Sequence, residues 1–213
     1  MKLYGYWRSS STYRVRIACE LKGLAVESVP IHLVRDVGEQ HAEAFRKLNP
    51  QGLVPVLVDG AAVLSQSLAI IEYLDETQDG PRLLPDDTLG RARVRSMAML
   101  VAAEIQPLNN LGVLQFLKHE MGADDAARDS WYLHWIARGF GALEARLSES
   151  ATGDFCHGDA PGLVDCFLVP QVYNALRYQC SMDDYPRLHA IHARCQTLPE
   201  FQRAAPEAQA DAD

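Results

Sequence analysis

The hydrophobic and polar residues of this chain show one pattern of periodicity in the first 80 residues and another in the rest. In the first 80 residues, short runs with a period of two, typical of β-strands, alternate with runs of helical spacing. The Asp59-Gly60 pair between two of the short runs is typical of a β-hairpin turn. The pattern predicts the order β-α-β-α-β-β-α. The expected strands are 2–7, 25–33, 53–58 and 61–64, and the expected helices are 13–22, 39–48 and 67–77.

Helical spacing takes over in the rest of the chain. A segment rich in Pro, Gly and Asp ends the mixed region, and apolar residues beyond it recur with the period of an α-helix. The expected helices are 89–121, 124–148, 163–179 and 187–196. We therefore expect an α/β domain over residues 1–80, a linker over 81–87, an all-helical domain over 88–206 and a flexible tail over 207–213.

Composition narrows the classes of partner. The chain has 28 acidic and 20 basic residues, and its formal charge of −8 argues against nucleic acid or an anionic membrane as the main partner. No apolar run approaches the roughly 18 residues of a membrane span, and the first residues do not resemble a secretory signal, so we expect a cytoplasmic protein. The five cysteines are widely spaced, which predicts mostly buried free thiols and no metal site.

Four hydroxyl residues, Ser9, Ser10, Ser11 and Thr12, lie where the first strand gives way to the first helix. Hydroxyls at such a junction cap exposed N–H groups, and the partial positive charge of a helix start favours an anion. A thiolate held there would gain a hydrogen bond as well as the dipole, so the pKa of its thiol would fall. A plain helix cap without a ligand explains the same residues.

Two further segments carry polar chemistry. Pro55 interrupts the apolar run 53–57, so it belongs at a sheet edge or at a cis bond in a tight bend. Such a bend would leave the N–H and C=O of Val54 to pair with an extended peptide ligand. Gln66 and Ser67 open an amphipathic helix, whose start could accept a carboxylate. An edge-strand proline and an unliganded helix cap are the alternatives.

Taken together, the three segments resemble the glutathione transferase superfamily and, more narrowly, its zeta class. The string RSSSTYRVRIA at residues 8–18 is similar to the zeta-class signature RSSCSxRVRIA. The similarity continues through residues 49–50, 66–74, 83–85, 105–111 and 168–172. The resemblance implies a thioredoxin-like N-terminal domain followed by a helical-bundle C-terminal domain, which is the glutathione transferase fold.

The resemblance also implies roles for individual residues and a homodimeric assembly. Hydroxyls at the first helix would hold the sulfur of glutathione, with Ser9 and Ser10 as the two candidates for direct contact. Arginines would bind the carboxylates of the substrate. The implied residues are Ser9, Ser10 and Ser11 for the sulfur, Val54 and Pro55 for the cysteinyl part, Gln66 and Ser67 for the γ-glutamyl end, Asn109 and Asn110 lining the cleft, and Arg8 and Arg177 for the substrate.

The activity that the resemblance implies is the glutathione-dependent cis–trans isomerisation of maleylacetoacetate to fumarylacetoacetate. The thiolate would add to the cis double bond, the new single bond would rotate, and glutathione would be expelled unchanged. Maleylpyruvate isomerisation and glutathione transfer to α-halo acids are alternatives, because the same pocket would serve them. A non-catalytic adaptor with this fold is a further alternative, against which the intact set of glutathione-binding residues argues.

Three positions depart from the family pattern. Ser11 replaces the zeta-class cysteine, so a protein thiol is lacking there, although isomerisation uses the thiolate of glutathione. Leu111 and Gly112 follow the paired asparagines, just after which related maleylpyruvate isomerases have arginine, and this favours the longer maleylacetoacetate. Gly162 stands three residues before Asp165 where Ser or Thr is usual, so we expect a less firmly capped helix and a folding role for Asp165.

Overall fold

The computed structural model describes residues 1–35 and 38–212 of the chain. These residues form two compact units. The N-terminal unit comprises residues 1–84 together with the residues from 196 onward, and the helical unit comprises residues 85–195. The chain therefore leaves the first unit once and later returns to it.

A four-stranded mixed sheet forms the centre of the N-terminal unit. Its strands, in the spatial order β2-β1-β3-β4, are β1 (Lys2–Gly5), β2 (Glu27–Pro30), β3 (Val56–Asp59) and β4 (Ala62–Ser65). β1 pairs with β2 in parallel, whereas the β1–β3 and β3–β4 pairs are antiparallel. Asp59 pairs with Ala62, so the predicted hairpin turn joins β3 to β4.

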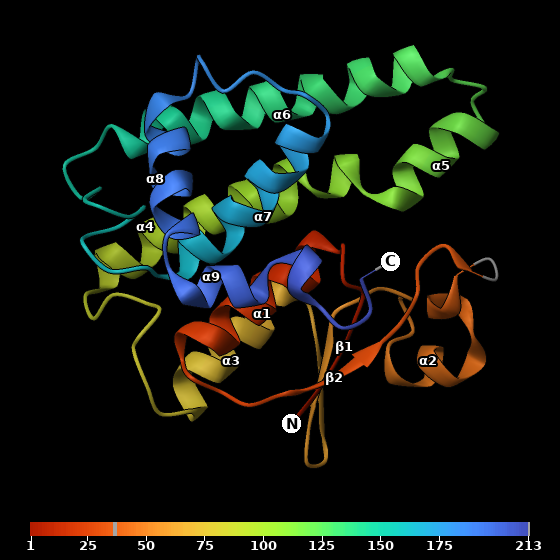
Figure 1. Ribbon diagram of the computed structural model, residues 1–213, viewed down its shortest axis with the longest axis horizontal. Coiled ribbons are helices and arrows are strands. Elements are labelled where there is room, and N and C mark those ends of the chain that lie inside the picture. The colour runs from red at the N-terminus through yellow and green to blue at the C-terminus, as the bar shows by residue number, and fades with distance from the viewer. Residues whose placement is uncertain (36–37, 213) are drawn as a thin grey trace. The chain divides into compact units, whose positions relative to one another are not determined.

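Helices cover both faces of this sheet. α1 (Ser10–Leu21) and α3 (Ser67–Thr77) lie on one face, and α2 (Glu43–Leu48), which follows a 3-10 turn at Glu39–His41, lies on the other (Figure 1). Apolar residues at helical spacing in α1 and α3 are buried, because they face the sheet and each other. The predicted thioredoxin-like order is confirmed, with β1, β2 and β3 shorter than the periodicity suggested.

The strand register brings three loops to one edge of the sheet. Tyr4 pairs with Val56, and Val56 pairs with Ser65. Because both pairs are antiparallel, the end of β1, the start of β3 and the end of β4 lie side by side. The segments that follow or precede these points, residues 6–9, 53–55 and 66–67, therefore share this edge. All three candidate segments of the N-terminal unit are at this place.

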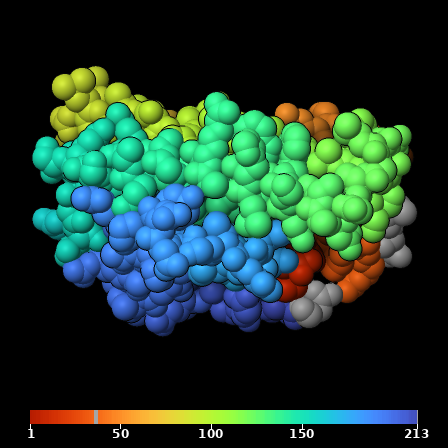
Figure 2. Space-filling model, turned by 90° about the horizontal axis from the view of Figure 1, so that it is seen from above, coloured from red at the N-terminus to blue at the C-terminus, as the bar shows by residue number. Residues whose placement is uncertain are grey.

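Five main helices form the second unit: α4 (Thr88–Met99), α5 (Leu111–His119), α6 (Asp125–Leu147), α7 (Leu163–Arg177) and α8 (Pro186–Gln196). α7 is the central one, since eleven of its fifteen residues are buried. α6 and α8 lie at the surface of this unit, in green to teal and in blue (Figure 2). At Gly139 of α6 a Cβ would clash with Cδ1 of Ile105, so glycine allows the close approach.

The predicted helix 89–121 is wrong as a single element. α4 ends at Met99 and continues as a π-helical turn at Leu100–Ile105, which a 3-10 turn at Pro107–Asn109 follows before α5 begins. Pro107 cannot donate a helical hydrogen bond, and the Oδ1 atom of Asn110 starts a new helix by accepting from the Val113 N–H at 3.0 Å. Apolar spacing continues through this break, which is why periodicity did not reveal it.

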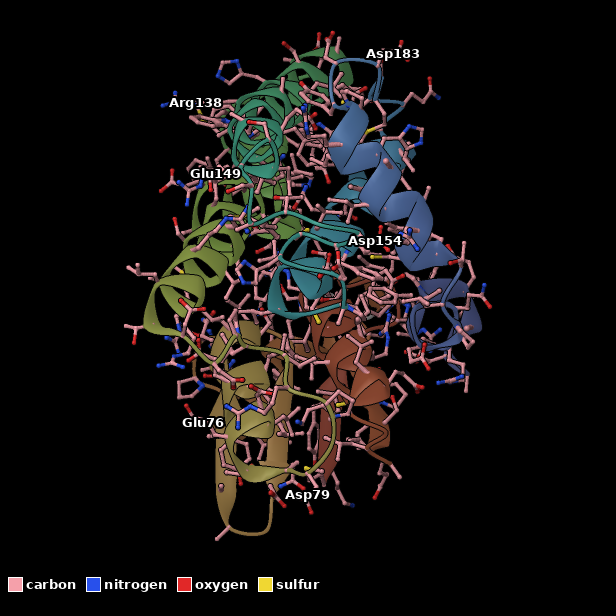
Figure 3. All side chains as sticks on the ribbon, turned by 90° about the vertical axis from the view of Figure 1, so that its left-hand side faces the viewer. Glu76, Asp79, Arg138, Glu149, Asp154 and Asp183 are labelled. Atoms are coloured by element: carbon pink, nitrogen blue, oxygen red, sulfur yellow. The ribbon has the colours of Figure 1, made fainter. Side chains whose placement is uncertain are left out.

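The segment between α6 and α7 is fastened by one arginine. Arg93 of α4 donates to a Glu149 carboxylate oxygen at 3.0 Å, to Thr152 Oγ1 at 2.8 Å and to the Cys156 carbonyl at 2.8 Å. Figure 3 labels Glu149 and Asp154 on this segment. Asp165 accepts from the Gly162 N–H at 2.8 Å and from the Cys156 N–H at 3.1 Å, which is the folding role expected for it. Burial raises the pKa of this carboxyl group.

The residues expected to form a linker are part of the packed N-terminal unit as far as Leu84. A buried ion pair holds them, because Lys22 Nζ lies 3.4 Å from Asp75 Oδ1 and donates to the Pro81 carbonyl at 3.1 Å. The same Oδ1 atom accepts from the Leu83 N–H at 2.8 Å. The polar composition of residues 81–87 thus overstated the length of the connection.

The expected boundary at residue 206 also differs from the structure. α9 (Pro199–Ala204) belongs to the N-terminal unit and packs against α1. Phe201 is fully buried, and Arg203 forms an ion pair with Glu20 at 2.7 Å. A 3-10 turn at Pro206–Ala208 follows, in which Pro206 is buried. The expected tail from residue 207 is therefore preceded by a packed element that the low-complexity composition concealed.

Candidate functional site

The start of α1 is capped by the first serine of the group. Ser9 has extended backbone angles, and its Oγ atom accepts a hydrogen bond from the Thr12 N–H at 3.2 Å. Its own hydroxyl proton is not used in that bond. Gly5 allows β1 to lie close to α1, because a Cβ there would clash with Cγ2 of Thr12. Ser9 is therefore both a structural cap and a hydroxyl donor at the sheet edge.

Ser10 and Ser11 are the first two residues of α1, and both are partly exposed. Their N–H groups belong to the first helical turn, which has no intrahelical acceptor. Arg8 lies immediately before the cap, and its guanidinium carbon is 5.2 Å from the centre of the Trp7 ring. Within the described ranges, Arg8 forms no ion pair. This arrangement presents hydroxyl, N–H and guanidinium donors from four consecutive residues.

The segment before β3 contains a cis peptide bond between Val54 and Pro55. β3 is an inner strand of the sheet, so the edge-strand explanation of this proline is wrong and the cis alternative is confirmed. Neither the N–H nor the C=O of Val54 forms a hydrogen bond with another described residue. One donor and one acceptor of the main chain are therefore available to an extended ligand.

The start of α3 has no side-chain cap. Gln66 precedes the helix with φ +70 and ψ +116, which a residue other than glycine rarely adopts, and its side chain does not cap the helix. The first intrahelical hydrogen bond runs from the Ile70 N–H to the Gln66 carbonyl at 3.0 Å. The N–H groups of residues 67–69 therefore have no acceptor within the helix. Ser67 is the first helical residue and is only 5% exposed.

Two residues that sequence reasoning missed contact this helix start. Arg14 of α1 donates from Nη1 to Ser67 Oγ at 3.3 Å, and Gln51 accepts from Gln66 Nε2 at 3.1 Å. Arg14 lies inside α1. Its contact spans 53 positions of the sequence. No local pattern indicates such a contact, and the turn around Gln51 has no distinctive signal.

The paired asparagines of the helical unit have different partners. Asn110 uses Oδ1 to cap α5, as described above. Asn109 is 7% exposed and donates from Nδ2 to the Tyr132 carbonyl at 3.1 Å. That bond fixes the orientation of the amide, since only its NH2 group can donate. Asn109 Oδ1 is buried and has no hydrogen-bond partner among the described residues, so it is an acceptor directed at something else.

Arg177 is the last residue of α7 and is exposed. Its guanidinium carbon lies 6.0 Å from the centre of the Tyr173 ring. The next residue, Tyr178, stacks on Tyr132 with ring centres 3.6 Å apart, so an aromatic contact holds the chain just after the arginine. A cation in the last turn of a helix also interacts favourably with the helix dipole. The structure is thus compatible with a structural as well as a binding role.

The family models match both units of the chain. Residues 3–82 match the N-terminal domain of glutathione S-transferase, and residues 126–194 match its C-terminal domain. This chain belongs to the glutathione S-transferase family. Among curated relatives, a probable maleylacetoacetate isomerase of Vibrio cholerae is 52% identical over 99% of this chain and 97% of its own length. A maleylpyruvate isomerase of a Ralstonia species is 48% identical over 99% of both chains.

Solved structures place this glutathione S-transferase in the zeta class. A holo maleylpyruvate isomerase, described as a zeta-class bacterial enzyme, superimposes with a TM-score of 0.96 at 47% identity over the whole of both chains. The maleylacetoacetate isomerase of Anaeromyxobacter dehalogenans gives a TM-score of 0.86 at 42% identity over 100% of this chain and 97% of its own. That structure holds dicarboxyethyl glutathione and citrate in the active site.

None of the five cysteines of this glutathione S-transferase, all of which are described, forms a disulfide, and four of them are buried. Burial raises the pKa of Cys19 to about 12 and also raises the pKa values of Cys156, Cys180 and Cys195. These four thiols therefore stay protonated near neutral pH. Ser11 stands in place of the zeta-class cysteine, so the start of α1 offers no protein thiol either.

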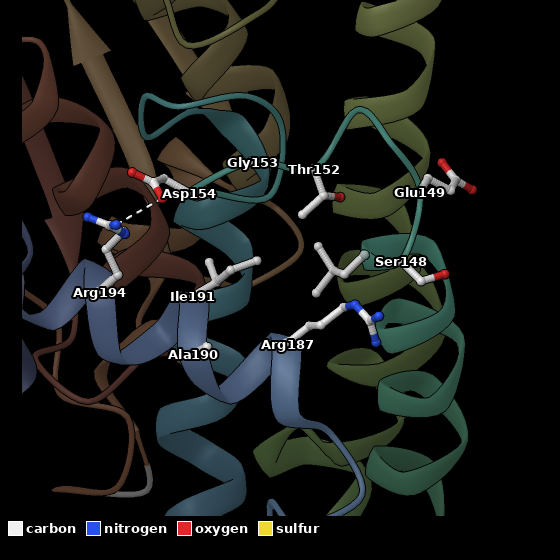
Figure 4. A pocket seen from close by; sticks show the side chains of 10 residues that line it. Ser148, Glu149, Thr152, Gly153, Asp154, Arg187, Ala190, Ile191 and Arg194 are labelled. Carbon is white, nitrogen blue, oxygen red and sulfur yellow. Dashed lines mark ion pairs between the residues drawn. The ribbon is translucent and has the colours of Figure 1, made fainter.

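A pocket of about 470 Å³ lies elsewhere, within the helical unit. It is lined by α8 and by the segment that follows α6 (Figure 4). The two arginines that line it are already paired, Arg187 with Glu144 at 3.4 Å and Arg194 with Asp154 at 2.8 Å. It contains none of the candidate residues, and we do not assign the function to it.

In the described part of the chain, no helix has the length and apolar character that a membrane span requires.

Proposed function

We propose that this glutathione S-transferase is a glutathione-dependent cis–trans isomerase that converts maleylacetoacetate to fumarylacetoacetate. The observation that carries the proposal is the set of unused donors at one edge of the sheet. These are the α1 start with its serines, the main chain of Val54, and the uncapped start of α3. The set fits an extended tripeptide that has a thiol in the middle and a carboxylate at one end.

Each part of the tripeptide has a group to receive it. The free N–H and C=O of Val54, before Pro55, would pair with the cysteinyl residue as an added strand. Gln66 and Ser67 would bind the γ-glutamyl carboxylate at the positive end of α3. Ser9 and Ser10 would donate to the sulfur, beside Ser11 and the N–H groups of the first turn. These donors stabilise the ionised form of the thiol and so lower its pKa.

The substrate is a dianion, and this chain offers arginines for its carboxylates. Arg8 precedes the serines and makes no ion pair in the described ranges, and Arg177 ends α7. A planar guanidinium binds a carboxylate through two parallel hydrogen bonds, which a lysine cannot do. Asn109, whose Oδ1 lacks a partner, and Asn110 would orient the bound molecules. When bound, glutathione supplies the thiolate that adds to the double bond and is expelled after rotation.

The choice between two substrates rests on the residues after the paired asparagines. Leu111 and Gly112 follow them here, whereas related maleylpyruvate isomerases have arginine just after the pair, so this chain has one cation fewer for a compact dianion. We therefore place maleylacetoacetate first and maleylpyruvate second, although relatives with both names match over the whole chain. Glutathione transfer to α-halo acids is the third candidate, since the same donors would activate the thiolate.

The test is a direct assay with both cis substrates, at matched concentrations and with glutathione as the variable. We expect faster turnover of maleylacetoacetate, no turnover without glutathione, and no net consumption of the thiol. A faster reaction with maleylpyruvate would reverse the order of substrates. Stoichiometric loss of the thiol with an α-halo acid, without isomerisation of either substrate, would instead identify a conjugating transferase. Failure to bind immobilised glutathione would favour the adaptor.

We also propose that the protein is a cytoplasmic homodimer, as the resemblance to the family implies. Sedimentation equilibrium of the purified chain tests the assembly, because the monomer mass is 23.6 kDa and a dimer has twice that mass. A species that remains at the monomer mass at high protein concentration would contradict the proposal.

A further inference from the structure

A buried arginine lies between α1 and α3, behind the start of α3. Arg14 is 2% exposed, although it is one of the largest polar side chains of the protein. Its neighbours in sequence, Tyr13 and Val15, are also buried, and α1 packs against α3 along this face. Burial lowers the pKa of Arg14 to about 9, so the guanidinium carries its charge at neutral pH. A positive charge is therefore held inside the N-terminal unit next to α3.

The bond between Arg14 and Ser67 fixes the direction of a proton. A guanidinium has donors only, so Ser67 Oγ must accept in the 3.3 Å bond from Nη1. The single hydroxyl proton of Ser67 then points to another partner. Ser67 is only 5% exposed, and no described residue accepts that proton. A buried donor without an acceptor in the protein itself indicates an acceptor supplied by a ligand.

The surroundings of this hydroxyl define the chemistry of the ligand. The N–H groups of residues 67–69 are free of intrahelical partners, Gln66 provides no cap, and the helix start carries partial positive charge. The Ser67 hydroxyl and the main-chain N–H groups all donate at this helix start. The Arg14 guanidinium lies behind them, hydrogen-bonded to the Ser67 hydroxyl. Such a group of donors suits a carboxylate, and in glutathione the carboxylate of the γ-glutamyl residue is the one expected at this end.

We propose that Arg14 is a positioning residue, which holds the Ser67 hydroxyl with its proton directed at the γ-glutamyl carboxylate and places a buried positive charge behind it. The inference rests on the proposed binding of glutathione at this edge of the sheet. Arg14 would not touch the ligand. Its effect would pass through Ser67 and through the charge that it adds to the helix start.

Arg16 provides a matched comparison, since it is the same residue type two positions further along α1. Its guanidinium donates to the main-chain carbonyls of Trp7 at 2.8 Å and Ala204 at 2.9 Å, so its role is to fasten α9 and the β1–α1 loop. If Arg14 has only such a structural role, the two arginines should respond alike to substitution. If Arg14 positions Ser67, its substitution should affect one particular group of the ligand.

The experiment uses Arg14→Met, Ser67→Ala, the double variant and Arg16→Met as the control. Binding of two ligands is measured by titration calorimetry: glutathione and γ-aminobutyryl-cysteinyl-glycine. In the second ligand, hydrogen replaces the γ-glutamyl α-carboxylate and the amino group is kept, so it lacks the carboxylate alone. Urea unfolding of each variant reports the stability of the fold.

We expect Arg14→Met to weaken glutathione binding roughly 10- to 100-fold, as for a lost hydrogen bond to a charged group. Its affinity for the analogue without the carboxylate should stay within about twofold of the wild-type value. The double variant should bind glutathione no more weakly than Ser67→Ala, because both substitutions remove the same interaction. Arg16→Met should leave both affinities unchanged. Where Arg14→Met does not fold, Arg14→Lys is expected to show the same ligand selectivity with a smaller loss.

Two results would overturn the inference while leaving glutathione binding intact. One is unchanged glutathione affinity in Arg14→Met, and the other is an equal loss of affinity for both ligands. A selective loss that adds fully to that of Ser67→Ala would also overturn it, since Arg14 would then act independently of the hydroxyl. Absence of glutathione binding by the wild-type protein is a separate outcome, which would end the proposed function itself.

Discussion

The starts of α1 and α3 lie at the same edge of one sheet, and both carry serine, yet their polar groups have different partners. At α1, Ser9 satisfies its own helix by accepting from the Thr12 N–H. At α3, Gln66 leaves the helix uncapped, and Ser67 accepts from Arg14 instead. The first start has a side-chain cap in the absence of a ligand, whereas the second has none and leaves one buried hydroxyl proton without an acceptor among the described residues.

This difference separates stability from binding. A satisfied helix cap contributes to folding whether or not a ligand is present. An uncapped start with a residue at positive φ costs folding energy, and such strain is usually found where it serves a function. We therefore expect substitutions at the α1 start to affect both stability and chemistry, and those at the α3 start to affect mainly the affinity for glutathione.

The largest expected effect comes from removing both sulfur donors. Ser9→Ala combined with Ser10→Ala should lower kcat/KM roughly 100- to 1,000-fold, as for the loss of donors to a developing anion. Without these donors the pKa of the bound thiol rises, so the acid limb of the pH profile should move to higher pH. The measurement is kcat/KM against pH. An unshifted limb would show that the serines do not hold the sulfur.

A smaller effect is expected at the α3 start. Ser67→Ala should weaken glutathione binding roughly 10- to 100-fold, because a charge-assisted hydrogen bond to the carboxylate is lost. Turnover at saturating glutathione should change little, since the sulfur remains among its donors. Steady-state kinetics with glutathione as the varied substrate separate KM from kcat. A fall in kcat with KM unchanged would contradict the proposal that the α3 start binds glutathione while the α1 start activates its sulfur.

The cap itself gives a third prediction. Ser9→Ala alone should lower the free energy of unfolding by about 1 kcal/mol, the usual cost of losing a serine N-cap. Ser10→Ala, which removes a hydroxyl from the first helical residue but no cap, is the matched control and should change stability by less than about 0.5 kcal/mol. Urea unfolding measures both. Equal effects would mean that the Ser9 hydroxyl contributes nothing as a cap.

The smallest effect concerns the backbone of Gln66. Glycine tolerates positive φ, whereas alanine does not, so Gln66→Gly should be more stable than Gln66→Ala by about 1 kcal/mol. Both variants lose the amide that donates to Gln51, so their difference isolates the backbone. Unfolding midpoints of the two proteins decide the matter. If Gln66→Ala were as stable as Gln66→Gly, the backbone at the start of α3 would not be strained. Strain would then not distinguish the α3 start from the α1 start.

Local signals predicted much of the fold and part of the site. The order of strands and helices along the first 80 residues and most helix starts follow from periodicity, from the Asp59-Gly60 turn and from hydroxyl residues at helix starts, all of which are encoded within a few positions. The break after α4 was missed because Val101 and Ile105 maintain the apolar pattern through the π-helical turn. The Arg14–Ser67 bond was missed because it depends on how two helices pack, and no spacing along the chain records it.

The return of α9 to the N-terminal unit has a consequence for synthesis. Its helix covers α1 through Phe201 and Ala204, and Arg16 reaches the Ala204 carbonyl. A ribosome adds about 5–20 residues per second, so the 120 residues between Leu84 and Ala204 take about 6–24 s to make. During that interval the nascent N-terminal unit has all its strands, but the surface of α1 that α9 will cover is exposed. A fragment ended at residue 84 would keep that exposed surface permanently and should aggregate.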